Sequence, residues 1–391
     1  MCEKPAFRTE TTPGGRPEGS NGLECVPKIT FLCFCAIISF MKTIRDINVK
    51  NKTVLVRVDY NVPIKDDKIT DDLRIRASLP TLQYLLDHNA KQIVLISHLG
   101  RPEGKPDAKY SLAPAAKALQ KLLPDQKVVF LPLPTAEKPL TIPKDAKITL
   151  LENLRFDPGE EANDSDFIKN IAKATNTDLY VQDGFAVIHR AHASTDAVKH
   201  HLPVYAGLLI EAEINNLNKI IKNPEKPLLV IIGGAKVEDK QPLIDKFANQ
   251  ADHIYVGGKI AADGYKAKNP KIIVAHDFDE NEKGKKLDIG PLSTGDLANL
   301  ITDASTVIWN GLLGYAEDPA YATSSTIAAE LIGEKAGATT IICGGDTTGF
   351  VETLAKDHPN LQYSLISTGG GATLEFLLGK ELPGLAAIKT K

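Results

Sequence analysis

Short runs of aliphatic and β-branched residues alternate with amphipathic helical patterns along the chain from Met41 onward. This alternation is typical of parallel sheets wound with helices. In the first half it predicts strands at 54–59, 93–97, 128–131, 148–151 and 179–183. In the second half it predicts strands at 228–232, 253–256, 272–274, 306–309, 339–343 and 363–367. We therefore expect an α/β fold with two doubly wound parallel-sheet domains that face each other across a hinged cleft.

A long helical pattern separates the two halves. It follows Pro203 and runs from Tyr205 to Ile221, with apolar residues on one face. A chain of 391 residues exceeds the size at which one hydrophobic core keeps growing, so two domains are expected. We predict an N-terminal domain at 41–206, a C-terminal domain at 207–375, and a tail at 376–391 that packs back on the N-terminal domain.

Residues 1–40 differ in composition from the rest of the chain. A polar run with Gly and Pro precedes the apolar stretch 29–40, and four of the five cysteines lie here. The stretch is too short to span a bilayer and has neither a strongly basic lead nor an A-x-A site, although a signal anchor stays open as the alternative. Met41 opens a sequence typical of a domain start, so we expect a leader that is disordered or not translated. Cys343 is then the single thiol, which fits a cytoplasmic protein.

Arginines are concentrated in the first half of the chain and glycines in the second. All nine arginines lie at or before Arg190, whereas only four glycines fall between Met41 and Ala206 against 21 from Gly207 to the end. Lysine is the commoner cation throughout, so compositional drift is one explanation. The other is that the retained arginines bind carboxylate or phosphate as planar forks. A net charge of −3 gives no field that would recruit nucleic acid or membrane, and neither partner is expected.

Polar clusters follow the predicted strands of the first half. Because the carboxyl ends of parallel strands share one edge of a sheet, they are expected to form one pocket with Arg74, which starts the next helix. Four inward guanidinium groups would repel one another unless a small, multiply charged anion lay among them. His98 could equally be a core residue, and Arg190 disfavours a zinc site at His189 and His192. The clusters comprise Asp59, Asn61, His98, Arg101, Arg155, His189 and Arg190.

Glycine loops take the corresponding positions in the second half. Backbone N–H groups at such turns and at helix N-termini bind phosphate, although a single Gly-Gly pair is usually only a turn. Lys236 and Lys240 are four residues apart and could both face a phosphate chain. Asp346 is either a helix cap or a Mg²⁺ ligand. Neither G-x-G-x-x-G nor the P-loop pattern is present. The loops are 233–236, 257–258, 310–314, 344–347 and 368–371.

Nine ordered motifs between Met41 and Lys391 resemble the phosphoglycerate kinase family. The resemblance implies a Mg²⁺-dependent glycolytic enzyme, in most cases a cytoplasmic monomer, that transfers a phosphoryl group between ATP with 3-phosphoglycerate and ADP with 1,3-bisphosphoglycerate. In-line transfer would follow hinge closure. The motifs are RVDYNVP at 57–63, ITDDLRIR at 69–76, SHLGRP at 97–102, LENLRF at 151–156, HRAHAS at 189–194, GGAKV at 233–237, WNG at 309–311, GGDT at 344–347 and STGGGA at 367–372.

Site roles are carried over from the resemblance by position. For catalysis it implies Arg74, Lys236, Lys240 and Gly370. For the acyl-phosphate substrate it implies Asp59, Asn61, Arg74, His98, Arg101, Arg155, His189 and Arg190. For the nucleotide it implies Ala235, Lys236, Lys240, Gly257, Gly258, Asn310, Glu317, Gly344, Gly345, Asp346 and Thr347, with Asp346 reaching the metal through the Mg²⁺-nucleotide.

Departures from the family pattern concentrate in the nucleotide half and bear on the base preference. Lys259 stands where Gly is expected, Leu312 where Pro is expected, and Tyr315 where Val is expected, and the stretch 272–287 is shortened. In the first half, QDGFA at 182–186 replaces an Asn-Asp-Ala-Phe-Gly pattern. Two rival interpretations remain, a binding protein that has lost catalysis and a kinase that acts on another carboxylate. The first would be expected to lose Arg74, Lys236 or Asp346, and the chain keeps all three.

Overall fold

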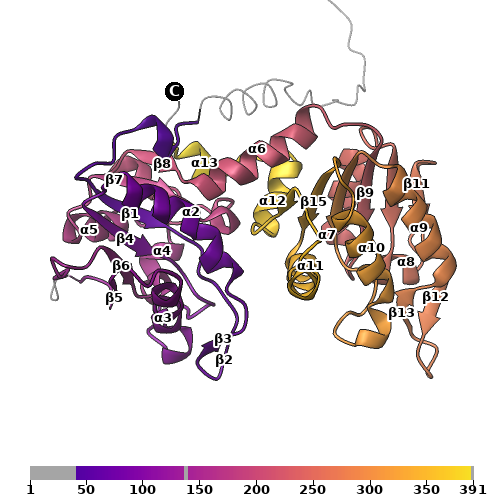
Figure 1. Cartoon of the computed structure of the whole chain (residues 1–391), viewed down its shortest axis with the longest axis horizontal. Coiled ribbons are helices and arrows are strands. Elements are labelled where there is room, and N and C mark those ends of the chain that lie inside the picture. Colours follow the sequence, from indigo (N-terminus) through magenta and orange to yellow (C-terminus); the bar gives the residue numbers. More distant parts are fainter. Residues whose placement is uncertain (1–40, 136–139, 389–391) are drawn as a thin grey trace, which may run out of the picture.

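The computed structural model describes residues 41–135 and 140–388 and contains two six-stranded sheets, one in each half of the chain (Figure 1). The strand order is β5-β6-β4-β1-β7-β8 in the first sheet and β11-β10-β9-β14-β15-β16 in the second. Every pairing within these two sheets is parallel. The predicted α/β fold class is confirmed. The expected leader and the last three residues lie outside the described part of the chain.

The strands of each sheet are short and largely buried. In β1, β6, β9 and β14 every residue is buried, which explains why they occur in the sequence as continuous apolar runs. The first sheet comprises β1 (Thr53–Arg57), β4 (Gln92–Ile96), β5 (Val128–Leu131), β6 (Ile148–Leu151), β7 (Leu179–Gln182) and β8 (Val204–Ala206). The second comprises β9 (Leu228–Ile232), β10 (His253–Val256), β11 (Ile272–Val274), β14 (Thr306–Asn310), β15 (Thr339–Cys343) and β16 (Leu365–Ile366).

Helices cover both faces of each sheet, and local caps fix several of their ends (Figure 1). Asp157 and Asp164 accept backbone hydrogen bonds at the starts of α4 and α5, and Pro occupies the first turn of α3, α9 and α13. The first half contains α2 (Leu73–Asp87), α3 (Ala113–Leu122), α4 (Pro158–Glu161) and α5 (Ser165–Ala174). The rest of the chain contains α6 (Leu208–Lys222), α7 (Val237–Phe247), α8 (Gly258–Ala262), α9 (Pro291–Asp303), α10 (Thr323–Gly333), α11 (Gly345–Asp357), α12 (Gly371–Leu377) and α13 (Pro383–Ala386).

Single-turn 3-10 helices lie mainly at the loops around the first sheet. They are η1 (Ile44–Asp46), η2 (Ala108–Tyr110), η3 (Leu154–Phe156), η4 (Phe185–Val187), η5 (Ala197–His200) and η6 (Pro319–Tyr321). Two of them, η3 and η4, follow β6 and β7 within a few residues. They therefore carry the chain past the carboxyl edge of the sheet, where the candidate site lies.

Helix α6 connects the two halves (Figure 1). The sequence pattern predicts this helix from Tyr205, but the structure places Tyr205 in β8, which pairs with β7, and starts the helix after Gly207. The prediction is wrong at this end because the backbone of 204–206 is used in the sheet. One hydrophobic cluster runs from Leu55 in the first sheet through Leu217 of α6 to Val230 in the second. The apolar face of α6 is thus shared by both cores.

Two antiparallel hairpins were not predicted from the sequence. The first joins β2 (Ile64–Lys65) to β3 (Lys68–Ile69) through Asp66 and Asp67, both of which have positive φ. The second joins β12 (Phe278–Glu280) to β13 (Lys286–Ile289), in the stretch that is shortened relative to the family pattern. Two-residue strands and a mixed polar sequence gave no alternation long enough to detect.

The end of the described chain returns to the first half. Gly384 donates its backbone N–H to the carbonyl oxygen of Ile188 over 2.8 Å, and Leu385 is buried in the shared hydrophobic cluster. Figure 1 shows α13 beside the amino-terminal part of α6. The domain borders given above stay a prediction. Within the described residues, none of the helices has the length and apolar content that crossing a membrane requires.

Candidate active site

Asp59, Arg74 and His98 meet at the carboxyl edge of the first sheet. Arg74, in the first turn of α2, donates from Nη1 to Oδ2 of Asp59 over 2.6 Å. His98 follows β4 and places Nδ1 at 3.8 Å from Oδ1 of Asp59. Asp59 and His98 are both buried, whereas Arg74 is about one-third exposed. The carboxylate thus fixes one edge of a guanidinium group whose other edge borders solvent.

The loop after His98 is held by two side chains of the same cluster. The backbone N–H of Gly100 donates to Oδ1 of Asn61 over 2.9 Å, and Nη1 of Arg155 donates to the carbonyl oxygen of Gly100 over 2.7 Å. Arg155 is buried on η3, and its Nε has no hydrogen-bond partner in the structure. Arg101, the next residue of the loop, is exposed. A buried guanidinium N–H without a partner is suited to a ligand oxygen.

His189 and Arg190 follow η4 at the other side of the cluster. Nε of Arg190 donates to Nε2 of His189 over 3.3 Å, and both side chains are partly buried. Burial, followed by the charge of Arg190, lowers the pKa of His189. An uncharged imidazole accepts this hydrogen bond, so no second positive charge lies beside that of Arg190.

The electrostatic potential of this edge is set by arginines. Burial lowers the pKa of His98 well below its usual value, and the charges of Arg57, Arg155, Arg190 and Arg74 lower it further. His98 is therefore neutral at physiological pH. The neighbouring groups make the pocket a site for anions and disfavour a metal cation bound by histidine.

Arg57 is a residue of this cluster to which the sequence analysis gave no role. It ends β1 with 1% of its surface exposed, donates from Nε to Ser194 Oγ over 2.8 Å, and contacts His98 Nδ1 at 3.2 Å. Ser194 in turn donates to the buried carboxylate of Glu160 over 2.6 Å. An arginine directly after the apolar run 54–56 was the available signal, because a buried charge needs partners.

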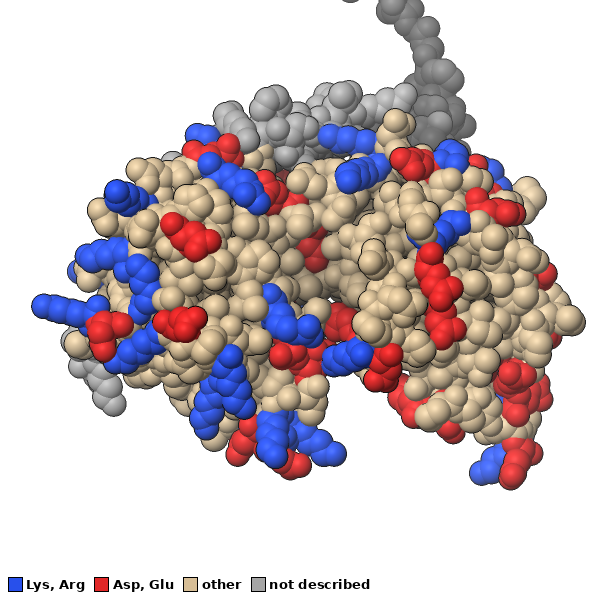
Figure 2. All heavy atoms as spheres, viewed as in Figure 1, with Lys and Arg blue, Asp and Glu red and all other residues tan. Residues whose placement is uncertain are grey.

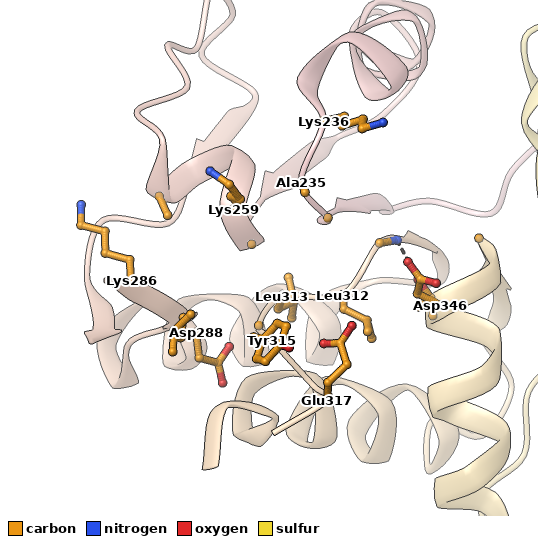
Figure 3. A pocket seen from close by; sticks show the side chains of 18 of the residues that line it. Ala235, Lys236, Lys259, Lys286, Asp288, Leu312, Leu313, Tyr315, Glu317 and Asp346 are labelled. Carbon is orange, nitrogen blue, oxygen red and sulfur yellow. Dashed lines mark hydrogen bonds between the residues drawn. The ribbon is translucent and has the colours of Figure 1, made fainter. Parts of the chain in front are cut away.

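The second half holds a cavity of about 450 Å³ at the carboxyl edge of its sheet (Figure 3). Figure 3 shows Lys259 and Lys286 at one end and Asp346 at the other, with Tyr315 and Glu317 between them. Predicted nucleotide residues that line the cavity are Ala235, Lys236, Lys240, Gly258, Glu317, Gly344, Gly345, Asp346 and Thr347. The remaining polar lining includes Asp239, Lys259, Lys285, Lys286 and Asp288.

Glycine is required where the loops of this cavity touch. A Cβ atom on Gly311 would lie 2.2 Å from the carbonyl oxygen of Gly233, and one on Gly233 would lie 2.2 Å from that of Leu312. Gly234 and Gly311 also have φ values of +91° and +104°. These contacts bring the ends of β9 and β14 together at the base of the cavity.

Asn310 and Gly257 do not line the cavity themselves. Asn310, the last residue of β14, is buried and accepts a hydrogen bond at Oδ1 from Nζ of Lys240. Its Nδ2 donates to Sγ of Cys343 over 3.2 Å. Burial lowers the pKa of Lys240, whereas Cys343, Asp239 and Asp346 act in the opposite direction. Asn310 therefore positions the ammonium group of Lys240 without lining the cavity itself.

Asp346 lies in the first turn of α11, and the N-cap of this helix is Gly344. Asp346 therefore does not occupy the N-cap position, and its side chain is exposed at the cavity. No cluster of three or more His, Cys, Asp or Glu suited to a metal occurs in residues 41–135 and 140–388. A single carboxylate beside the predicted phosphate-binding loops fits Mg²⁺, which binds through one or two carboxylates and substrate phosphates.

The two half-sites approach each other at a crevice of about 140 Å³. Asn61, Asp71 and Arg74 line it from the first half, and Gly345 and Glu352 line it from α11. Thr368, on the last glycine loop, lines it as well and donates to Oε1 of Glu213 on α6.

The last glycine loop also touches the first half directly. A Cβ on Gly369 would lie 2.5 Å from the ring of Phe185, and one on Gly371 would lie 3.7 Å from Nε2 of His189. Gly370, the N-cap of α12, has a φ of +48°. The arginine cluster and the glycine loops thus face a common gap.

Comparison with known proteins gives one consistent family. The family model for phosphoglycerate kinase matches residues 44–283 and 264–380. Phosphoglycerate kinase from Fervidobacterium nodosum is 39% identical over 400 residues, covering 89% of this chain and 98% of the relative. That from Pseudothermotoga lettingae is 40% identical over 399 residues, with the same coverage.

Solved structures agree with the sequence relatives. Phosphoglycerate kinase from Coxiella burnetii has a TM-score of 0.73 at 32% identity, and that from Pyrococcus horikoshii has a TM-score of 0.76 at 28% identity. Each comparison covers 89% of this chain and 98% of the other. With a family model that spans most of the chain and relatives near 40% identity, the chain belongs to the phosphoglycerate kinase family.

Proposed function

We propose that the chain is a phosphotransferase that moves a phosphoryl group reversibly between ATP with 3-phosphoglycerate and ADP with 1,3-bisphosphoglycerate. The observation that carries this proposal is the crevice in which Arg74 of the anion cluster faces Gly345 and Thr368 of the glycine loops. Family membership supports the same reaction, since the named relatives are phosphoglycerate kinases.

The arginine cluster binds the small anionic substrate in this proposal. Arg155 and Arg190 neutralise its phosphate, and the loop from His98 to Arg101 closes around it. Arg74, already oriented by Asp59, neutralises the carboxylate that attacks. The substrate residues are those predicted from the sequence: Asp59, Asn61, Arg74, His98, Arg101, Arg155, His189 and Arg190.

The cavity of the second half binds the nucleotide, with its phosphates toward Asp346 and Lys240 and its base toward Lys259 and Lys286 (Figure 3). Lys236, Lys240 and the helix start at Gly370 stabilise the transferring oxygens. Asp346 holds Mg²⁺ together with the phosphates, and the bound ion supplies charge neutralisation.

The reaction needs no covalent enzyme intermediate. The substrate carboxylate attacks the terminal phosphorus in line with the leaving ADP oxygen, so the residues act by positioning and charge stabilisation. Because the two ligands bind to separate halves, the halves close around them and exclude water. Hinge bending about α6, a monomeric state and a cytoplasmic location complete the proposal.

A coupled assay with 3-phosphoglycerate and a panel of nucleoside triphosphates tests the function. We expect turnover with ATP and Mg²⁺, and the panel measures how far Lys259, Lys286 and Tyr315 admit other bases. Absence of turnover with every nucleotide would overturn the proposal. Turnover with another carboxylic acid and none with 3-phosphoglycerate would establish the rival kinase.

A further inference from the structure

Glu352 is a buried carboxylate in the gap between the two halves. It lies in the middle of α11, on the nucleotide half, and only 8% of its surface is exposed. Its Oε1 has no hydrogen-bond partner in the structure. Burying a carboxylate with an unpaired oxygen is unfavourable, so this residue is costly to stability as it stands. The sequence motifs gave no reason to select it.

The groups that face Glu352 come mainly from the other half. Asp71 and Arg74 line the same crevice of about 140 Å³, and Asp71, Arg76, Lys356 and Arg74 are the charges that act on its ionisation. Of these four, only Lys356 shares its helix. Burial is the largest effect, Asp71 acts in the same direction, the three cations oppose them, and the pKa of Glu352 rises to about 7. Figure 2 shows acidic and basic side chains meeting at this gap.

Arg74 has a guanidinium edge available on the side of the crevice. Its ion pair with Asp59, within the first half, uses one nitrogen, Nη1. A guanidinium group presents five N–H donors in a planar fork, enough to donate to two carboxylates at once. Arg76, two residues further along α2, also acts on the ionisation of Glu352, but it already pairs with Asp72 at 2.8 Å.

We propose that Glu352 is a positioning residue: when the halves close, its ionised carboxylate binds Arg74 from the nucleotide half and orients it toward the substrate carboxylate. This inference rests on the function proposed above. Asp59 and Glu352 then hold Arg74 from the two halves, so the catalytic arginine is fully oriented only in the closed enzyme. The contact also couples closure to proton release, because a protonated Glu352 carries no charge for Arg74.

The test compares the Glu352→Gln and Glu352→Asp variants with the unmodified enzyme from pH 5.5 to 8.5. We expect unmodified kcat/KM for 3-phosphoglycerate to fall on the acid side of about pH 7, as Glu352 takes up its proton. In Glu352→Gln, kcat/KM at pH 8 falls roughly tenfold and the acid limb disappears. Glu352→Asp keeps the acid limb and part of the activity. The Kd for ADP stays within about twofold in both variants, since nucleotide contacts are unchanged.

Asp357→Asn is the matched control, because it removes a carboxylate from the exposed end of the same helix. It should leave both kcat/KM and its pH profile unchanged. Thermal unfolding of each variant separates loss of fold from loss of positioning. An unaltered pH profile in Glu352→Gln, or a loss confined to nucleotide binding, would overturn the inference.

A double-mutant cycle identifies the partner of Glu352. If Glu352 acts on Arg74, the effects of Glu352→Gln and Arg76→Gln on kcat/KM are additive. Strong coupling between these two substitutions would assign the contact to Arg76 and overturn the inference in this form. Failure of the unmodified enzyme to turn over 3-phosphoglycerate is a different result, which would instead contradict the proposed function.

Discussion

Asp59 and Arg74 form an ion pair of 2.6 Å in which the carboxylate is buried and the guanidinium borders the gap between the halves. Asp59 lies two residues after the end of β1, and Arg74 lies in the first turn of α2, so the pair connects a strand end to a helix start. It holds the arginine at the edge of the anion cluster before any ligand arrives. Asp59 therefore preorganises one side of the guanidinium group.

Replacing Arg74 with alanine tests its role in the chemical step. We expect kcat to fall roughly 10²- to 10³-fold, because charge on the attacking carboxylate is no longer neutralised. The Kd for ADP should be nearly unchanged, since Arg74 belongs to the other half. Steady-state kinetics and calorimetry measure the two quantities. Arg45→Ala, which removes an exposed arginine paired with Glu211, is the control, and a large loss of nucleotide affinity in Arg74→Ala would show that the halves are wrongly assigned.

Lys240→Met should weaken nucleotide binding and leave 3-phosphoglycerate binding unchanged. Lys240 lines the cavity and its ammonium donates to Asn310, so its charge is fixed near the predicted phosphates. A hydrogen bond from a charged donor contributes about 1.5–3 kcal/mol of binding free energy. Its loss corresponds to roughly a 10- to 150-fold rise in Kd. Calorimetric titration with ADP measures the change. Lys266→Met, at an exposed position, should have no effect, and equal losses in both variants would argue against a specific role.

Asp183 predicts a pH-dependent difference in stability. Its Oδ1 accepts from the backbone N–H of Leu209 over 3.0 Å, but Oδ2 is buried without a partner, and burial raises its pKa to about 7. The folded state therefore binds this proton more tightly than the unfolded state, which stabilises the folded protein. This stabilisation is fully present below about pH 4 and is lost as pH rises toward 7.

The Asp183→Asn variant should not show this decrease in stability with rising pH. Relative to the unmodified protein, the variant gains stability as pH rises from 4 to 7, by up to about 1.4 kcal/mol per pH unit. Urea denaturation at several pH values gives the difference in the free energy of unfolding. The exposed Asp357→Asn variant should show no such trend. A difference that stays constant with pH would mean that Asp183 is already charged in the folded protein.

Most of the fold could be predicted from the sequence because several of its strands are buried at every position. Runs such as Leu228–Ile232 are apolar at every position, and the structure has this strand with the predicted ends. The strand Val204–Ala206 was missed because three residues beside a helical pattern carry too little signal, and pairing with β7 decides their conformation. The two hairpins were missed for the same reason, because their strands are too short to show a pattern in the sequence.

The candidate site was predictable only as far as strand ends determine it. The rule that parallel strands share an edge predicts a common pocket for Asp59 and His98, and the structure places them 3.8 Å apart. No pattern in the sequence could place Glu352 in the same crevice as Arg74, because that relationship depends on how the halves are arranged. Arg57 could have been selected, since a charge at the end of a buried strand requires buried partners.

Asp346→Asn distinguishes a metal-linked role from a purely structural one. Asp346 is exposed in the first turn of α11, where a negative charge also favours the helix by about 0.3–1 kcal/mol. If its carboxylate helps hold Mg²⁺ with the nucleotide phosphates, the variant needs roughly tenfold more Mg²⁺ for half-maximal rate, because a neutral amide oxygen is the weaker ligand. Initial rates over a Mg²⁺ titration at saturating nucleotide measure this shift. Asp239→Asn, which removes another carboxylate lining the same cavity, is the comparison. A lowered melting temperature with an unchanged Mg²⁺ requirement would assign Asp346 to the helix alone, and the nucleotide would then carry its metal without a ligand from this residue.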